Sequence, residues 1–100
     1  MDILEGIAKS IAAKYSPEMI ILFGSVAKRR HTVDSDIDLC VVLEFEDKVK
    51  TTVDMQLDLH KFGKALDIVL YTPEKWAEYS ILPGSFAHKI KEEGEVLYAR

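Results

Sequence analysis

The sequence predicts a mixed α/β domain, in which helices flank a mixed β-sheet. Helical and strand-like patterns alternate along its 100 residues. Residues 19–23 form a short continuous apolar run, which suits a strand buried on both faces. Residues 36–43 alternate with period two, as a second strand would. A chain of this length fits one domain, so we expect residues 1–100 to form a single unit.

The N-terminal half is predicted to be a helix, a strand and a loop. Residues 2–15 carry apolar side chains at helical spacing, and Asp2 with Glu5 can form a capping box. Gly24 and Ser25 end the strand over residues 19–23. One or two helical turns over 26–30 and a polar loop over 31–35 would then lead to the second strand.

The C-terminal half adds a helix, a strand, two short helices and a last strand. Residues 47–62 suit a helix with two adjacent apolar rows, Val49, Val53 and Leu57 in one and Met55, Leu59 and Phe62 in the other. Residues 66–71 suit a strand. Thr72 and Pro73 open a helix to about residue 79, and residues 83–85 open another that ends at Gly94. Residues 95–99 can form a short strand.

Composition excludes several classes of protein. Thirteen basic against 17 acidic residues give a net charge of −4, which disfavours a general nucleic-acid binder. A single cysteine, Cys40, allows neither an internal disulfide nor a four-thiolate zinc site. No apolar run approaches the roughly 20 residues of a membrane span, and the acidic start lacks the pattern of a secretory signal. We therefore expect a cytoplasmic protein.

Asp36 and Asp38 are the first candidate site residues. On a strand they project from the same face, roughly 6–7 Å apart, and like charges this close oppose each other's ionisation. A divalent cation that prefers oxygen ligands, Mg²⁺ or Mn²⁺, would resolve this repulsion. The alternative is a solvated Asp36 and an Asp38 paired with a base. A calcium loop starting at Asp34 is excluded, because its sixth and twelfth positions hold Leu39 and Phe45.

A second signal is the turn at Gly24 and Ser25, directly after the buried strand. Free backbone N–H groups at such a turn, before a helical turn, favour an anion. The basic cluster over residues 28–31 could hold a polyphosphate, although such turns and clusters are more often plain surface features. Asp67, inside the apolar run 65–71, is the third signal, because a carboxylate early in a buried strand needs a partner. It either forms a structural salt bridge or completes a three-carboxylate site.

Taken together, these residues resemble a known family. The pattern Gly24-Ser25-x-Ala27, a gap, Ser35-Asp36-x-Asp38 and a later strand Asp is similar to the minimal nucleotidyltransferases of the DNA polymerase β superfamily. The resemblance extends over essentially the whole chain. Lys28 stands where that family usually has Arg, which keeps the charge but loses the planar guanidinium. Arg29 stands where the family usually has Gly, so we expect the turn and its phosphate contacts to differ from the family pattern.

The resemblance implies a chemistry and a set of site residues. Such enzymes transfer a nucleoside monophosphate from an NTP, here expected to be AMP from ATP, to an acceptor hydroxyl. Asp36, Asp38 and Asp67 would hold two Mg²⁺ ions, and Asp67 could also take the proton of the hydroxyl. The implied nucleotide- and phosphate-binding residues are Gly24, Ser25, Lys28, Arg30 and Ser35.

The resemblance also implies a partner. A catalytic core that uses nearly all 100 residues leaves no room for an acceptor-binding domain. Minimal nucleotidyltransferases are commonly paired with an all-helical HEPN toxin and act as its antitoxin, in some systems by adding AMP to a toxin tyrosine. The alternatives are a binding antitoxin of weak or no activity, and transfer to a small molecule such as an aminoglycoside. The sequence leaves open whether the protein self-associates.

Overall fold

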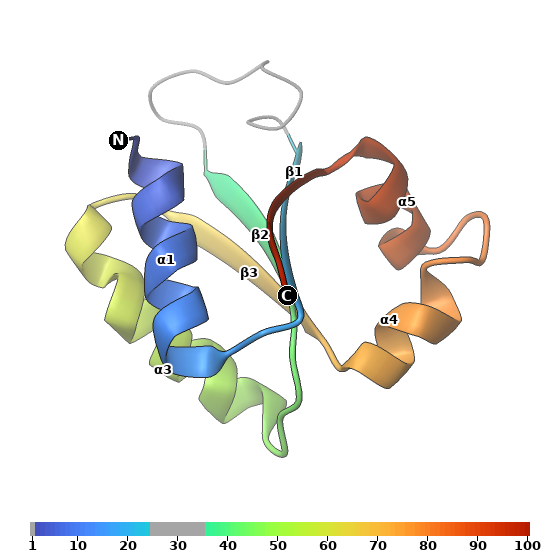
Figure 1. Ribbon diagram of the computed structural model, residues 1–100, viewed down its shortest axis with the longest axis horizontal. Coiled ribbons are helices and arrows are strands. Elements are labelled where there is room, and N and C mark those ends of the chain that lie inside the picture. Colours follow the sequence, from blue (N-terminus) through green and yellow to red (C-terminus); the bar gives the residue numbers. More distant parts are fainter. Residues whose placement is uncertain (1, 25–35) are drawn as a thin grey trace.

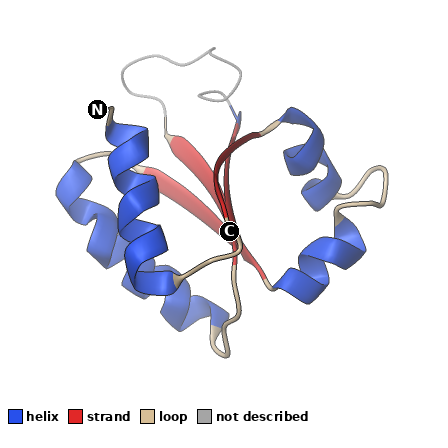
Figure 2. Cartoon of the chain, viewed as in Figure 1, coloured by secondary structure: helices blue, strands red, loops and turns tan. Residues whose placement is uncertain are grey.

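The computed structural model describes residues 2–24 and 36–100 and contains a four-stranded mixed sheet of order β3-β2-β1-β4. Figures 1 and 2 show the sheet between two layers of helices, which confirms the predicted α/β class. The elements are α1 (Ile3–Tyr15), β1 (Met19–Phe23), β2 (Ile37–Val42), α3 (Lys48–Leu59), the 3₁₀ helix η1 (His60–Phe62), β3 (Leu66–Tyr71), α4 (Pro73–Tyr79), α5 (Phe86–Glu93) and β4 (Glu95–Ala99).

The sheet combines antiparallel and parallel pairing. β1 runs antiparallel to both β2 and β4, whereas β2 and β3 are parallel. A parallel pair needs a crossover connection, and α3 with η1 supplies it. Because β2 and β3 run in the same direction, both strands start at the same end of the sheet.

Each face of the sheet has its own apolar core. The larger core packs α1 and α3 against one face, through residues such as Ile11, Leu39 and Met55. The smaller core packs α5 against the other face, through Cys40 and Ile90. The alternation predicted for residues 36–43 is confirmed, because odd-numbered side chains of this strand join the larger core and even-numbered ones the smaller.

Side-chain caps fix the starts of the helices. Asp2, Asp47, Thr72 and Ser85 each accept a hydrogen bond from a backbone N–H three residues later. The helix predicted over residues 47–62 is α only to Leu59 and then tightens to 3₁₀. The strand predicted from residue 36 begins at Ile37. Within the described ranges, no helix has the length and apolar character that would let it cross a membrane.

One polar cluster ties α1 to α3. Lys14 Nζ and Tyr15 Oη donate hydrogen bonds of 2.6 and 2.5 Å to Asp58 Oδ2. The bond from Lys14, followed by that from Tyr15, lowers the pKa of Asp58. Burial and the same carboxylate raise the pKa of Tyr15. The hydrogen bonds of this cluster are therefore strongest when Asp58 is ionised and Tyr15 is protonated.

We expect Asp58→Asn to lower the melting temperature at pH 7 by a few degrees. A carboxylate whose pKa is lowered by folding stabilises the fold above its unfolded pKa of about 3.9, and this contribution disappears as the pH falls through the folded value. Thermal unfolding of both proteins at pH 7 and pH 3 should show a difference that shrinks in acid. The control is Glu5→Gln, which breaks the exposed ion pair with Lys9 and leaves the Asp58 cluster unchanged. An Asp58→Asn effect of equal size at both pH values would contradict the electrostatic explanation.

Candidate functional site

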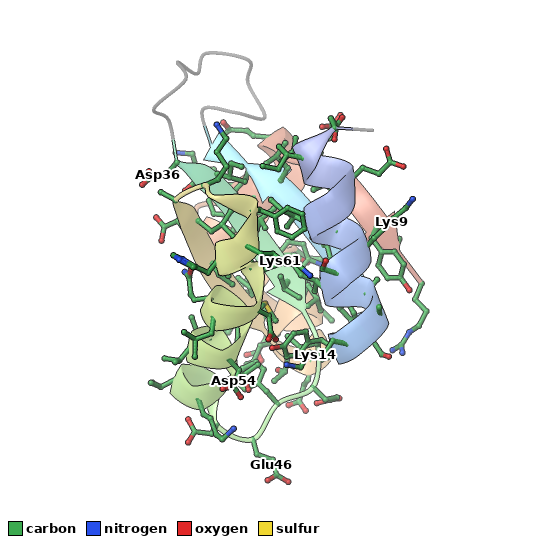
Figure 3. All side chains as sticks on the ribbon, turned by 90° about the vertical axis from the view of Figure 1, so that its left-hand side faces the viewer. Lys9, Lys14, Asp36, Glu46, Asp54 and Lys61 are labelled. Carbon is green, nitrogen blue, oxygen red and sulfur yellow. The ribbon has the colours of Figure 1, made fainter. Side chains whose placement is uncertain are left out.

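Two aspartates lie side by side where β2 and β3 begin. Asp38 on β2 is the register partner of Asp67 on β3, and partners in adjacent strands project from the same face of the sheet. Neighbouring strands are about 4.8 Å apart, so the two carboxylates are close. Asp36 lies two residues before Asp38, exposed and just outside the strand (Figure 3). The chain thus places Asp67 beside Asp38, with Asp36 close enough to affect the charge of Asp38.

The electrostatics of Asp38 reflect this arrangement. Partial burial, the nearby Asp67 and then Asp36 all raise the pKa of the Asp38 carboxyl. All three effects disfavour its charge, and no salt bridge with Asp38 is found among the residues that the structure describes. The alternative of an Asp38 paired with a base therefore has no support in the described part of the chain.

Gly24 lies against the same carboxylate. It follows β1, whose last residue, Phe23, is the register partner of Asp38. Its φ of 75° lies in the left-handed region that favours glycine. A Cβ atom added to Gly24 would overlap Oδ2 of Asp38 and lie 3.0 Å from Cγ. The backbone therefore passes the carboxylate at a distance that only glycine permits.

The three aspartates suit a divalent cation in their chemistry. Carboxylate oxygens on a rigid strand pair are ligands that Mg²⁺ and Mn²⁺ prefer. Partial burial first, and then the charges of Asp67 and Asp36, raise the pKa of the Asp38 carboxyl, so a nearby cation would favour its charged form. As they stand, the side chains in ranges 2–24 and 36–100 form no group of three or more acids, histidines or cysteines around one point. Asp36 and Asp67 are exposed, so their side chains can rotate toward Asp38. The residue set fits a metal, with rotation of these two side chains.

Part of the predicted site lies outside the described residues. Ser25, Lys28, Arg30 and Ser35, the predicted phosphate-binding residues other than Gly24, fall in residues 25–35. Their expected roles stay predictions. The same holds for the helical turns over 26–30.

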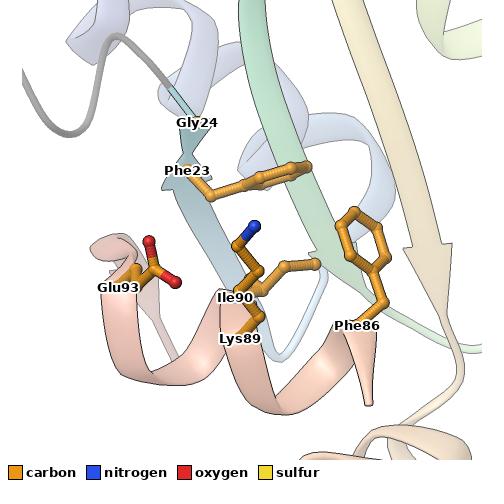
Figure 4. Close-up of a pocket in the computed structure, with 6 residues that line it drawn as sticks. All are labelled: Phe23, Gly24, Phe86, Lys89, Ile90 and Glu93. Atoms are coloured by element: carbon orange, nitrogen blue, oxygen red, sulfur yellow. The ribbon is translucent and has the colours of Figure 1, made fainter. Parts of the chain in front are cut away.

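An apolar pocket of about 170 Å³ adjoins Gly24 (Figure 4). Phe23 and Phe86 line one side of it, and their rings make an edge-to-face contact with centroids 5.6 Å apart. Lys89, Ile90 and Glu93 of α5 complete the lining. No pattern in the sequence predicts this pocket, because it forms only where α5 packs onto β1. The one available signal was an aromatic residue directly before Gly24.

Three other side chains have structural surroundings. Cys40 is buried in the smaller core, and burial raises its thiol pKa to about 12. His88 Nδ1 lies 2.9 Å from the backbone oxygen of Ser80. Trp76 packs edge-to-face on Tyr71. These contacts account for the three side chains without a ligand.

Comparison with known proteins gives one family and two structural neighbours. Residues 5–100 match the family described as polymerase beta, nucleotidyltransferase. None of the curated proteins matches the sequence. A Sulfolobus solfataricus protein described as a candidate nucleotidyltransferase superposes with a TM-score of 0.60 at 17% identity, over 98% of this chain and 78% of that one. A toxin–antitoxin solved with AMP-PNP superposes with a TM-score of 0.68 at 19% identity, over 96% and 73%. At these identities the two neighbours establish the shared fold.

Proposed function

Because the chain belongs to the polymerase β nucleotidyltransferase family, we propose that it transfers a nucleoside monophosphate, AMP from ATP, to an acceptor hydroxyl. The observation that carries the proposal is the register of Asp38 with Asp67, with Asp36 two residues away on the same chain. Three carboxylates near one end of the sheet, beside the turn at Gly24, suit the binding of a metal-bound triphosphate. In the reaction, the acceptor oxygen forms a bond to the α-phosphorus, and the bond to the leaving pyrophosphate breaks.

Asp36, Asp38 and Asp67 are the residues that would hold Mg²⁺ in this proposal. The bound metal would neutralise phosphate charge and make the acceptor hydroxyl more acidic. Asp38, held between Gly24 and Asp67, fixes the position of the site on the sheet. Asp67 is exposed on the edge strand, so its carboxylate oxygen can reach an arriving hydroxyl and accept its proton.

Gly24 would bring backbone N–H groups up to the phosphates. Its φ of 75° turns the chain directly after β1, and backbone amides at such a turn can bind phosphate oxygens. We propose that Ser25, Lys28, Arg30 and Ser35 add hydroxyl and cationic contacts to the triphosphate. In the acidic chain, this stretch carries the concentration of positive charge that an NTP needs.

We propose that the acceptor is carried by a partner protein, an all-helical toxin of the HEPN type. The neighbour described as a toxin–antitoxin with AMP-PNP favours both a toxin partner and an adenine nucleotide. The second candidate function is a binding antitoxin that neutralises the toxin by contact. The departures at Lys28 and Arg29 favour that alternative. The three carboxylates near one another favour catalysis, because a protein that only binds gains nothing from their mutual repulsion.

The test uses ATP labelled at the α-phosphate, Mg²⁺, the purified protein and lysate of its source. We expect label on a discrete protein band with the wild type and none with Asp36→Asn/Asp38→Asn. A charge-matched control, Glu44→Gln/Glu74→Gln, changes two exposed acids away from the site and should label normally. Absence of label with the wild type, together with a partner captured equally by wild type and the aspartate variant, would establish the binding antitoxin instead.

A further inference from the structure

The outer face of α3 carries an apolar stripe. Val49, Val53 and Leu57, one helical turn apart, have exposed fractions of 74%, 51% and 70%. Met55 and Leu59, on the opposite side of the helix, are buried in the larger core. An exposed, continuous row of large aliphatic side chains indicates a protein interface more often than it indicates free surface. We name residues 49, 53 and 57 the α3 stripe.

The α3 stripe is symmetric about Val53. Val49 lies four residues before it and Leu57 four residues after it. When two copies of α3 pack antiparallel across a two-fold axis, Val53 meets Val53 and Val49 meets Leu57 of the other copy. The same surface then serves both partners, and every exposed aliphatic side chain has an aliphatic counterpart.

Charges at the ends of α3 favour the same arrangement. Exposed acids precede the N-terminus of α3, at Glu44, Glu46 and Asp47. The exposed Lys48 and Lys50 in its first turn offset part of that charge, although Lys50 is paired with Asp54. Exposed lysines follow the C-terminus, at Lys61 and Lys64. Figure 3 shows Glu46 at the lower end of the helix and Lys61 nearer its upper end. Antiparallel packing brings the acidic end of one copy to the basic end of the other. It also opposes the two helix dipoles favourably.

The position of α3 argues against an acceptor protein at this surface. α3 packs on the face of the sheet formed by the odd-numbered residues of β2, whereas Asp38 shares the other face with Cys40. A protein bound to the α3 stripe would therefore have the sheet between itself and the aspartates. A second copy bound there leaves both aspartate sites open.

We propose that two copies of this chain associate through antiparallel α3 helices, with the two-fold axis at Val53. The inference does not depend on the proposed enzymatic function. Three side chains and their charged flanks supply less than the roughly 800 Å² per partner of a standard interface. The dimer is therefore expected to be reversible, with a micromolar or weaker dissociation constant.

Sedimentation velocity over a range of protein concentrations tests the proposal. The wild type should shift from monomer to dimer as its concentration rises, and Val53→Asp should stay monomeric, because it would bury two like charges at the axis. Val96→Asp is the matched control, a valine of similar exposure, 54%, on β4, and it should dimerise like the wild type. Circular dichroism and thermal unfolding check that both variants fold.

Cross-linking tests the axis itself. In Val53→Cys the two introduced thiols face each other, so a short bis-maleimide should produce a covalent dimer. Cys40 is fully buried with a raised pKa, so it should not react. Val96→Cys should give no covalent dimer under the same conditions, because its thiols lie outside the proposed interface. A wild type that is monomeric throughout, a dimer unaffected by Val53→Asp, or a stripe that binds only a different protein would each overturn the proposal.

Discussion

Replacing Asp38 by Asn is expected to remove nucleotidyl transfer and at the same time to raise the melting temperature. Loss of one carboxylate from the proposed metal site should lower the rate of label transfer by at least about 10²–10³-fold. The same change removes a charge that burial, Asp67 and Asp36 all disfavour. We therefore expect a small stabilisation, measured as a rise in the melting temperature of the variant above that of the wild type.

The opposite signs of these two effects are what make the prediction informative. A carboxylate kept only for structure would be paired, and its loss would destabilise the fold. A carboxylate kept for catalysis is held at a cost to stability, as functional groups commonly are. Asp36, which is exposed and outside the strand, should show the activity loss without a comparable gain in melting temperature.

Thermal unfolding with and without Mg²⁺ tests whether the Asp38 carboxylate contributes to metal binding. A ligand that binds only the folded state raises the melting temperature, so Mg²⁺ should stabilise the wild type and have much less effect on Asp38→Asn. The assay for activity is label transfer from ATP to the partner protein. Full activity in Asp38→Asn, or a clear fall in its melting temperature, would contradict the proposed role of this residue.

The sequence predicted the carboxylates of the candidate site but not the pocket beside it. Alternation over residues 36–43 determines that Asp36 and Asp38 share a face with Cys40, because a strand has only two faces. The neighbourhood of Asp38 and Asp67 was an inference from strand order, and the parallel register of β2 with β3 supports it. The pocket at Phe86 could not be foreseen, since it depends on how α5 packs against β1.

The helix over residues 47–62 shows the limit of pattern reasoning most clearly. Its two apolar rows are similar in composition, so periodicity alone could not say which of them faces the core. The structure buries Met55 and Leu59 and leaves the α3 stripe exposed. Burial is decided by where the crossover from β2 to β3 places the helix on the sheet, and that placement is a tertiary property.

Gly24→Ala is expected to be the most damaging substitution by a single methyl group in the described part of the site. The added Cβ meets the Asp38 carboxylate, so either the turn after β1 or the Asp38 side chain must move. Either movement displaces a proposed metal ligand or the backbone amides that would face the phosphates. A displacement of about 1 Å in such a site costs on the order of 10²-fold in rate.

Two contributions to the stability of Gly24→Ala can be separated experimentally. Alanine at positive φ is strained by about 1 kcal/mol, whatever surrounds it. Gly63, with φ of 68° and nothing within 4 Å of a built Cβ, isolates this cost, so Gly63→Ala is the matched control. We expect Gly24→Ala to lower the melting temperature more than Gly63→Ala, because it adds the overlap with Asp38.

A double-mutant cycle identifies the partner in that overlap. In an Asp38→Ala background the carboxylate is gone, and only the Cβ atom of residue 38 remains, 3.3 Å from the added methyl group. Adding Gly24→Ala should then cost clearly less than in the wild type, closer to the cost of Gly63→Ala. Equal costs of Gly24→Ala in both backgrounds would mean that the carboxylate is not what excludes a side chain at position 24. The close approach of Gly24 to Asp38 would then be incidental, and the turn after β1 would need glycine for its φ alone. A coupling of the predicted sign instead ties the glycine directly to the carboxylate that the proposed metal requires.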